Sequence, residues 1–244
     1  MKCIIVAAGY ATRLYPLTEN FPKPLLEVKG KPIIDWLIDD VDLLKQIDEY
    51  IVVTNHRFCH YFEDWSKTKK QNITIVDDLT QSNETRLGAV KDIELAIEKL
   101  NINDDILVMA GDNLLDFSLC EFVESCLKKK SSSVMAYEEN EISKLQRTGV
   151  LEIDKENRIT NMEEKPIKPK SNLACPPFYY FVKKDVPLIK EGLLSGCKKD
   201  APGDFLSWLV KKSEVYAFIM PGKRYDIGNL ESYNFIKENY KGIN

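Results

Sequence analysis

The sequence predicts an α/β fold, in which a mostly parallel sheet carries helices on both faces. Short, continuous apolar runs, typical of strands buried on both faces, alternate with segments whose apolar residues recur at helical spacing. The links between these segments are short, which favours parallel strands joined by right-handed crossovers. The chain has 244 residues, 44% of them hydrophobic, which suffices for one large domain with a proper core. We therefore expect a Rossmann-like sheet.

The first part of the chain contains the alternating elements. Strands are expected over residues 3–6, 50–53, 73–76, 106–110 and 134–137. Helices are expected between them, over residues 33–46, 57–69, 87–99 and 117–129. Pro32 suits the first position of a helix, and the lysine run that ends at Lys130 suits a helix C-terminus. Ligands of such sheets bind at the carboxyl ends of the strands.

Beyond about residue 140 the alternation gives way to a hairpin. Residues 149–154 and 158–164 read as two strands around the turn Lys155-Glu156-Asn157. Further strands are expected over residues 173–182 and 215–220. Further helices are expected over residues 184–194, 203–212 and 230–240. We interpret residues 1–244 as a single domain whose second part adds a small β-rich extension to the sheet.

Composition and charge argue against several classes of protein. A net charge of −4 disfavours general nucleic-acid binding, which needs a broad basic surface. No apolar run approaches the ~18 residues of a membrane span, and the N-terminus lacks the apolar core of a signal peptide. The six cysteines form no Cys-x-x-Cys pair and have no ligand spacing with the two histidines. A cytoplasmic protein with reduced thiols and no membrane association is the simplest interpretation.

The first strand runs into a loop of small residues that is followed by two cations. Ala7, Ala8 and Gly9 allow a ligand to approach the backbone closely and leave N–H groups to point at its oxygens. Arg13 is a planar cation suited to phosphate, and Lys23 stands on a backbone stiffened by a proline on either side. These features predict a phosphate-binding edge. A first strand and loop with two surface cations is the plainer alternative.

Two aspartates are candidate metal ligands. Asp112 follows the strand over residues 106–110 and a glycine, and hard cations such as Mg²⁺ prefer oxygen ligands. Asp226 lies just before the final helix, where a carboxylate at a helix entry is the simpler interpretation.

The whole stretch over residues 3–26 resembles the signature of the sugar-1-phosphate nucleotidyltransferases, of the glucose-1-phosphate thymidylyltransferase and uridylyltransferase kind. The shared strings are the apolar strand, Ala7-Ala8-Gly9, Thr12-Arg13-Leu14, Pro16-Leu17-Thr18 and Pro22-Lys23. The chain departs at Tyr10 and Ala11, where many relatives have glycine. The resemblance implies catalytic roles for Arg13 and Lys23, and nucleotide contacts from Ala7, Ala8, Gly9 and Thr12.

The resemblance also implies a Mg²⁺ site and a base-reading region. Asp112 and Asp226 stand at the positions of the family's two metal aspartates, although the segment Tyr-Asp-Ile-Gly-Asn around Asp226 matches loosely. Gln81 and Gly88 lie roughly where relatives read the base, with different spacing and neighbours. Residues 1–139 would then form the nucleotide-binding half of the domain.

The second half, residues 140–244, would bind the acceptor. In Glu163-Glu164-Lys165-Pro166 the resemblance implies that Glu164 contacts sugar hydroxyls and that Lys165 contacts the sugar phosphate. It also implies that the backbone of Gly149 approaches the sugar and that Asn172 belongs to the stretch closing its pocket. The chain departs from relatives after this stretch, where two prolines follow Cys175.

The function implied is Mg²⁺-dependent transfer of a nucleoside monophosphate from a nucleoside triphosphate to a sugar 1-phosphate, which gives a nucleotide sugar and pyrophosphate. Three alternatives stay open. They are a cytidylyltransferase acting on a phospho-alcohol such as choline phosphate or glycerol phosphate, a glycosyltransferase, and a non-catalytic nucleotide-sugar sensor. The base, the acceptor and the number of subunits also stay open, and a homo-oligomer is compatible with the sequence. We expect the two cations, Lys165 and the two aspartates to surround one cleft.

Overall fold

The computed structural model describes residues 1–200 and 202–243 and divides the chain into two compact units. Unit 1 contains Met1–Leu87, Ala110–Glu121 and the chain from Pro221 onward. Unit 2 contains Gly88–Met109 and Phe122–Met220. Each unit combines strands with helices, as the predicted α/β class requires.

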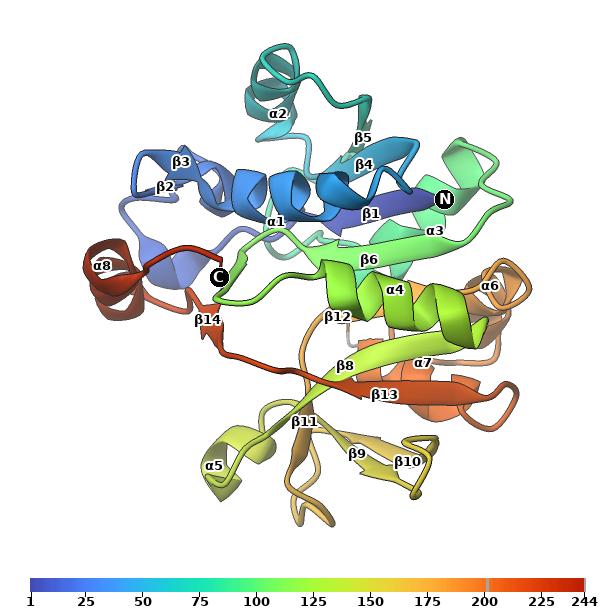
Figure 1. Cartoon of the computed structure of the whole chain (residues 1–244). Helices are drawn as coiled ribbons and strands as arrows, with labels where there is room; N and C mark the ends of the chain where they lie inside the picture. The colour runs from blue at the N-terminus through green and yellow to red at the C-terminus, as the bar shows by residue number, and fades with distance from the viewer. Residues whose placement is uncertain (201, 244) are drawn as a thin grey trace. The chain divides into compact units, whose positions relative to one another are not determined.

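Unit 1 is built on parallel strands. They are β1 (Lys2–Val6), β4 (Glu49–Thr54) and β5 (Ile73–Asp77). β4 pairs in parallel with both β1 and β5, and the strands lie side by side in Figure 1. The helices α1 (Ile33–Val41) and α2 (Cys59–Ser66) connect them. Because β1 and β4 are almost wholly buried, both read as continuous apolar runs, and the predicted parallel pairing is confirmed here.

Short strands bring distant segments of unit 1 together. β7 (Asn113–Leu115) pairs antiparallel with β14 (Arg224–Asp226), and Asp226 lies opposite Asn113. β2 (Glu27–Val28) pairs with β3 (Lys31–Pro32). The final helix, α8 (Leu230–Asn239), begins with a capping box between Asn229 and Ser232. The pairing of β7 with β14 therefore fixes where Asp226 stands in the unit.

Unit 2 contains a second set of paired strands. They are β6 (Ile106–Ala110), β8 (Ser132–Glu138), β12 (Phe178–Phe181) and β13 (Val215–Ile219). β12 is antiparallel to β6 and β8, whereas β13 is parallel to β8. β12 thus runs opposite to both of its neighbours, which strand–helix alternation alone does not reveal.

The predicted hairpin is present in unit 2. β9 (Gly149–Ile153) and β10 (Ile159–Glu164) are antiparallel, and β11 (Leu173–Cys175) joins β9 on its other side. The strand expected over residues 173–182 is divided into β11 and β12. The division falls at Pro176 and Pro177. Proline cannot donate a hydrogen bond to a neighbouring strand, so the pairing is interrupted there.

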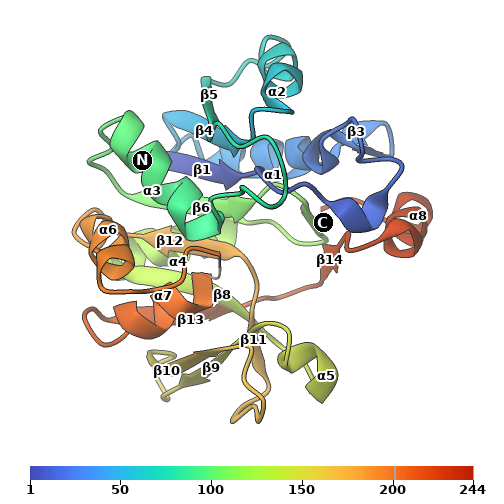
Figure 2. The same ribbon diagram turned by 180° about the vertical axis from the view of Figure 1, so that it is seen from behind.

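Helices cover both faces of the strands in unit 2. They are α3 (Ala89–Lys99), α4 (Cys120–Lys129), α5 (Ile142–Leu145), α6 (Pro187–Leu194) and α7 (Pro202–Leu209). α4 covers the face seen in Figure 1, and α6 and α7 lie side by side on the face seen in Figure 2. Phe122 of α4 packs on Phe218 with ring centroids 5.6 Å apart, and Phe205 of α7 packs on Phe181 at 5.8 Å. Among the helices so described, none is long and apolar enough to cross a membrane.

Asn55 joins the end of β4 to the loop that follows β1. Its side chain is fully buried. Nδ2 donates to the carbonyl of Ala8 over 3.0 Å, and Oδ1 accepts from the backbone N–H of Phe58 over 3.0 Å. One side chain therefore satisfies two buried backbone groups and fixes the small-residue loop against the sheet.

We expect Asn55→Ala to lower the free energy of unfolding by about 2–4 kcal/mol, because it leaves both backbone groups buried without partners. Urea denaturation measures the loss. Asn72→Ala is the matched control, since its amide donates one exposed hydrogen bond to Asp48, and its cost should stay below about 0.5 kcal/mol. Equal losses in the two variants would refute the structural role of Asn55.

Candidate active site

A pocket of about 300 Å³ opens in unit 1 at the carboxyl end of β1. Its volume falls at the lower end of the range for small-molecule sites. Its lining residues are Val6, Ala7, Gly9, Ala11, Arg13, Leu14, Lys23, Pro24, Ala110, Asp112 and Gly228. Arg13, Lys23 and Asp112, which the sequence singled out, therefore lie around one hollow.

The small-residue loop forms one wall of the pocket. The N–H of Ala7 donates to the carbonyl of Val53 over 2.8 Å, so it continues the sheet rather than facing a ligand. Ala8 is buried, and its carbonyl is bound by Asn55. Gly9 is exposed, and a Cβ built on it would meet no atom within 4 Å. Of these three residues, Gly9 has the most open surroundings for close approach of a ligand.

Ala11 adopts a left-handed conformation that favours glycine. Its φ is 47° and its ψ is 40°, immediately before the 3₁₀ turn η1 (Thr12–Leu14). Its carbonyl accepts from the N–H of Leu14 over 2.9 Å and from Thr18 Oγ1 over 2.8 Å. An L residue in this region is strained by roughly 1 kcal/mol, a cost that glycine does not bear.

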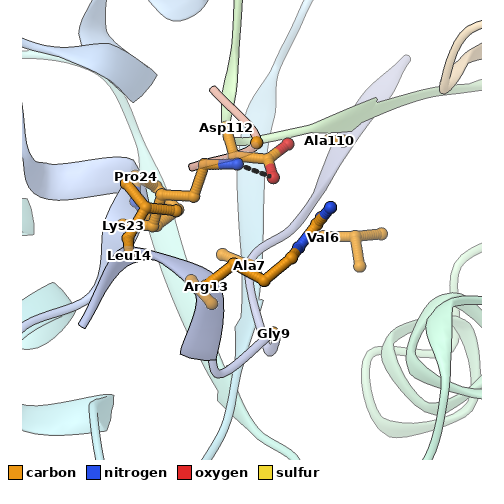
Figure 3. Close-up of a pocket in the computed structure, with 11 residues that line it drawn as sticks. Val6, Ala7, Gly9, Arg13, Leu14, Lys23, Pro24, Ala110 and Asp112 are labelled. Carbon is orange, nitrogen blue, oxygen red and sulfur yellow. Dashed lines mark hydrogen bonds and ion pairs between the residues drawn. The ribbon is translucent and has the colours of Figure 1, made fainter. Parts of the chain in front are cut away.

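Arg13 extends from η1 into the pocket (Figure 3). Its side chain is exposed, and no residue of the described chain forms a hydrogen bond or ion pair with its guanidinium. Thr12, one residue earlier, is exposed on the same turn. The Arg13 guanidinium is thus available to an anion.

Lys23 begins the 3₁₀ turn η2 (Lys23–Leu25), with Pro22 before it and Pro24 after it. The lysine is buried, and its Nζ lies 2.7 Å from Asp112 Oδ2 (Figure 3). The predicted rigid mounting is therefore combined with an ion pair that the sequence did not reveal. Each charge lowers the cost of withdrawing the other from water.

Two hydrogen bonds and one ion pair connect the two candidate metal carboxylates. Asn113 Nδ2 donates to Asp112 Oδ1 over 2.7 Å, and Arg224 Nη1 donates to Asn113 Oδ1 over 2.6 Å. Arg224 Nη1 also lies 3.7 Å from Asp226 Oδ1. Sequence reasoning missed Asn113 and Arg224, because their meeting depends on how β7 and β14 pair. Their sequence signal is proximity to the two aspartates, since Asn113 follows Asp112 and Arg224 stands two residues before Asp226.

Asp226 stands at the edge of the pocket. A Cβ built on Gly228, a pocket residue, would lie 3.8 Å from Asp226 Oδ2 and 4.0 Å from Arg13 Nη1. The part of the chain that is described holds no cluster of three or more acidic, histidine or cysteine side chains suited to a metal. Two carboxylates do fit Mg²⁺, which usually keeps several waters and takes other ligands from phosphate.

The predicted acceptor residues belong to unit 2. Gly149 lies opposite Glu164 across the β9–β10 pair and opposite Cys175 across the β9–β11 pair. Lys165 has a φ of 49°, and its Nζ lies 3.6 Å from Glu164 Oε1. Burial raises the pKa of the Glu164 carboxyl. Asn172 is exposed. The structure thus brings Gly149, Glu164 and Lys165 together, and their expected place around the cleft of Arg13 stays a prediction.

Gly88 and Gln81 belong to different units, and each has its own surroundings. Gly88 has a φ of 97°, and a Cβ built on it would lie 2.7 Å from the carbonyl oxygen of Lys199. The close approach at Gly88 is thus made by the protein's own backbone, which is reason enough for a glycine. Gln81 is exposed in the loop after β5. Their role in reading the base stays a prediction.

The sequence as a whole matches one protein family. The profile of the nucleotidyl transferase family matches residues 2–242. The chain belongs to this family.

Curated proteins similar to this nucleotidyl transferase include one whose name contains a sugar 1-phosphate. This chain is 32% identical over 229 residues to the bifunctional protein GlmU of Methanocaldococcus jannaschii. The match covers 93% of this chain and 51% of that protein. This chain is also 30% identical over 186 residues to the UTP–glucose-1-phosphate uridylyltransferase AglF of Haloferax volcanii, in a match that covers 74% and 72% of the two chains. The chain spans about half the length of the first of these relatives.

Solved structures confirm the Rossmann-like α/β fold. A putative glucose-1-phosphate thymidylyltransferase from Bacillus anthracis has a TM-score of 0.81 at 25% identity and covers 97% of this chain and 94% of its own. A UDP-glucose pyrophosphorylase complexed with UDP-glucose has a TM-score of 0.83 at 24% identity, covering 98% and 97% of the two chains. The second likeness concerns the fold alone.

The pKa of Glu164 makes the stability of this nucleotidyl transferase depend on pH. Because the folded-state pKa is raised, the folded protein binds the proton more tightly than the unfolded chain. The contribution of Glu164 to the free energy of unfolding is complete below its unfolded-state pKa of about 4.3. It is lost as the pH rises through the raised pKa of the folded state. We expect Glu164→Gln, which carries no titrating proton, to gain stability relative to the wild type between pH 4 and pH 8.

Urea denaturation of both proteins across that pH range measures the difference. Glu163→Gln serves as the control, because Lys170 and not burial dominates its surroundings and lowers the pKa of its carboxyl. A constant difference between Glu164→Gln and the wild type at every pH would contradict the prediction.

Proposed function

We propose that this protein transfers a nucleoside monophosphate from a nucleoside triphosphate to a sugar 1-phosphate and releases pyrophosphate. The observation that carries the proposal is the pocket of unit 1, where Arg13, Lys23 and Asp112 face one hollow beside the small-residue loop. Family membership and the names of the relatives, which include a glucose-1-phosphate uridylyltransferase and a glucose-1-phosphate adenylyltransferase, support the same reaction.

The reaction needs charge and position rather than a covalent intermediate. An oxygen of the acceptor phosphate attacks the α-phosphorus in line, and the bond to the leaving pyrophosphate breaks. Two unit charges of one sign at 4 Å repel by about 4 kcal/mol at an effective dielectric of about 20. Cations in the pocket offset this repulsion and the charge that develops on the leaving group.

Each cation has a distinct place in this scheme. Arg13, whose guanidinium has no partner within the described residues, binds the triphosphate on the side of the leaving pyrophosphate. Lys23 has three donors on a stiff backbone, so its ammonium can hold Asp112 and still turn an N–H toward the reacting phosphates. The geometry of Lys23 is set before any substrate arrives.

Asp112 and Asp226 would hold Mg²⁺. When bound, the ion neutralises phosphate charge and orients the triphosphate. The chain of Asn113 and Arg224 keeps the two carboxylates in fixed positions, and the cations Lys23 and Arg224 limit their mutual repulsion.

The acceptor would bind in unit 2, at the end of the β9–β10 pair. Glu164 presents a carboxylate that can accept hydrogen bonds from hydroxyl groups, and Lys165 supplies a mostly exposed ammonium for the phosphate. Gly149, which lies opposite Glu164 across the β9–β10 pair, would border this subsite with its backbone. Asn172 would border the same subsite.

The direct test incubates the protein with Mg²⁺, each common nucleoside triphosphate, and a panel of sugar 1-phosphates and phospho-alcohols. Released pyrophosphate is measured. We expect release with at least one sugar 1-phosphate. Release only with choline phosphate or glycerol phosphate would show that the acceptor is a phospho-alcohol and not a sugar 1-phosphate. Consumption of a nucleotide sugar without release of pyrophosphate would indicate a glycosyltransferase. No release with any pair would refute the proposed reaction.

We expect Lys23→Ala and Asp112→Ala each to lower kcat/KM at least ~100-fold. The first removes a cation that faces the reacting phosphates, and the second removes a carboxylate that would hold Mg²⁺ beside them. Steady-state kinetics measure the loss, and circular dichroism checks that both variants are folded. Lys31→Ala is the control. Lys31 Nζ also lies 2.7 Å from a carboxylate oxygen, that of Asp39, and neither residue lines the pocket. Near-normal turnover in either site variant would overturn these assignments.

We expect Asp226→Asn to raise the Mg²⁺ concentration needed for the half-maximal rate at least about tenfold, because an amide replaces a charged ligand. Rates measured over a Mg²⁺ titration give this concentration, and chelation by EDTA should stop the reaction. Glu231→Gln removes an equal charge from the exposed first turn of α8 and should leave the titration unchanged. An identical Mg²⁺ requirement in wild type and Asp226→Asn would exclude Asp226 as a ligand.

A further inference from the structure

Gly203, in the first turn of α7, directly faces the side chain of Glu164. A Cβ built on Gly203 would lie 1.9 Å from Glu164 Oε2, 3.0 Å from Glu164 Cδ and 3.0 Å from Met162 Cε. The first of these distances is far below a van der Waals contact. The carboxylate of Glu164 thus occupies space that exists because residue 203 has no side chain.

We propose that Gly203 is a positioning residue for the acceptor: the absence of its side chain fixes where the Glu164 carboxylate stands. The inference rests on the proposed function, in which Glu164 binds acceptor hydroxyls. Any larger residue at position 203 displaces the carboxylate and weakens acceptor binding, while the triphosphate pocket of unit 1 keeps its residues.

A second glycine borders the same carboxylate. A Cβ built on Gly149 would lie 3.3 Å from Glu164 Oε2 and 2.3 Å from Met162 Cε. Gly149 belongs to β9 and Gly203 to α7, so the carboxylate lies in a slot between a strand and a helix. Only 13% of the Glu164 side chain is exposed, and burial in this slot accounts for its raised pKa.

The slot cannot widen easily by moving α7. Ser207 Oγ donates a hydrogen bond to the carbonyl of Met162 in β10. Phe205 packs on Phe181 of β12 and stacks on Trp208 with ring centroids 6.3 Å apart. The helix is held by packing, whereas Glu164 Oε2 is the far end of a flexible side chain. A Cβ at position 203 would therefore be relieved by rotation of Glu164, at little cost to the fold.

Rotation of Glu164 would also disturb Lys165. Oε1, the other carboxylate oxygen, lies 3.6 Å from Lys165 Nζ. The backbone of Lys165 is fixed by its positive φ of 49° and by its N–H, which donates to the carbonyl of Thr148 over 3.0 Å. The backbone of Lys165 cannot follow the carboxylate freely. Rotation of Glu164 would therefore change the distance between the carboxylate and the ammonium that are offered to the acceptor.

A purely structural role for Gly203 predicts a different outcome. Glycine within a helix is less favourable than alanine, so Gly203→Ala would stabilise α7 if no side chain faced it. A variant that is no less stable but binds the acceptor poorly separates the positioning role from a structural one. The residue chosen to make the comparison is alanine, because it adds only the Cβ.

The experiment compares the wild type, Gly203→Ala, Glu164→Ala and the double variant. For Gly203→Ala we expect the KM of the sugar 1-phosphate to rise at least about tenfold, while the KM of the triphosphate stays within about twofold. In the Glu164→Ala background the same change should raise the acceptor KM no further, because the displaced carboxylate is gone. An unchanged acceptor KM, or an equal rise in both backgrounds, overturns the inference.

Thermal unfolding of the same four proteins tests the contact without any activity. We expect Gly203→Ala to raise Tm more in the Glu164→Ala background than in the wild type, because the conflict with the Glu164 carboxylate exists only in the wild type, whereas the approach to Met162 Cε is common to both. Equal shifts in the two backgrounds contradict the inference. If no acceptor is turned over, the proposed function fails while this cycle still decides whether Gly203 and Glu164 are coupled.

Discussion

The arrangement of the pocket depends on the ion pair between Lys23 and Asp112. One partner lies on a turn between two prolines, and the other follows β6 at the start of a short strand. Their 2.7 Å contact joins segments 89 residues apart and anchors the loop after β1 beside the carboxylate. Breaking this pair by replacing Asp112 leaves the buried Lys23 ammonium without its partner, which is destabilising. The pair therefore holds both the local fold and the charges of the pocket.

The charges around this pair are balanced except at Arg13. Lys23 faces Asp112, and Arg224 lies near Asp226, so each carboxylate has a cation beside it. Arg13 enters the same pocket with its guanidinium unpartnered by any described residue. A polyanion arriving there meets one free cation first. Binding can then redistribute the Lys23 and Asp112 contacts without leaving a charge unpaired, which fits a site built for phosphate groups.

Much of this could be predicted from the sequence, because the decisive signals were local. The buried strands β1 and β4 are continuous apolar runs, and Lys23 carries its stiffening prolines beside it in the chain. Arg13, Lys23 and Asp112 could be singled out for the same reason, since each sits at the end of a recognisable element. The resemblance to a known family added the order in which these strings occur.

The remainder depends on contacts between distant segments. The link from Asp112 to Asp226 follows from the pairing of β7 with β14, which no local pattern announces. Gly203 is an ordinary glycine near a helix start until Glu164 is seen against it. The division of the strand over residues 173–182 was visible in Pro176 and Pro177, but an apolar run on both sides outweighed it.

The central claim is that the phosphates of the nucleotide bind in the pocket of unit 1. A crystal structure with Mg²⁺ and a non-hydrolysable nucleoside triphosphate tests it most directly. The account predicts phosphate oxygens within hydrogen-bond distance of the Arg13 guanidinium and the loop at Gly9, with the ion bound to Asp112. A nucleotide bound elsewhere, with Arg13 still free and Asp112 in contact only with Lys23 and Asn113, would contradict it.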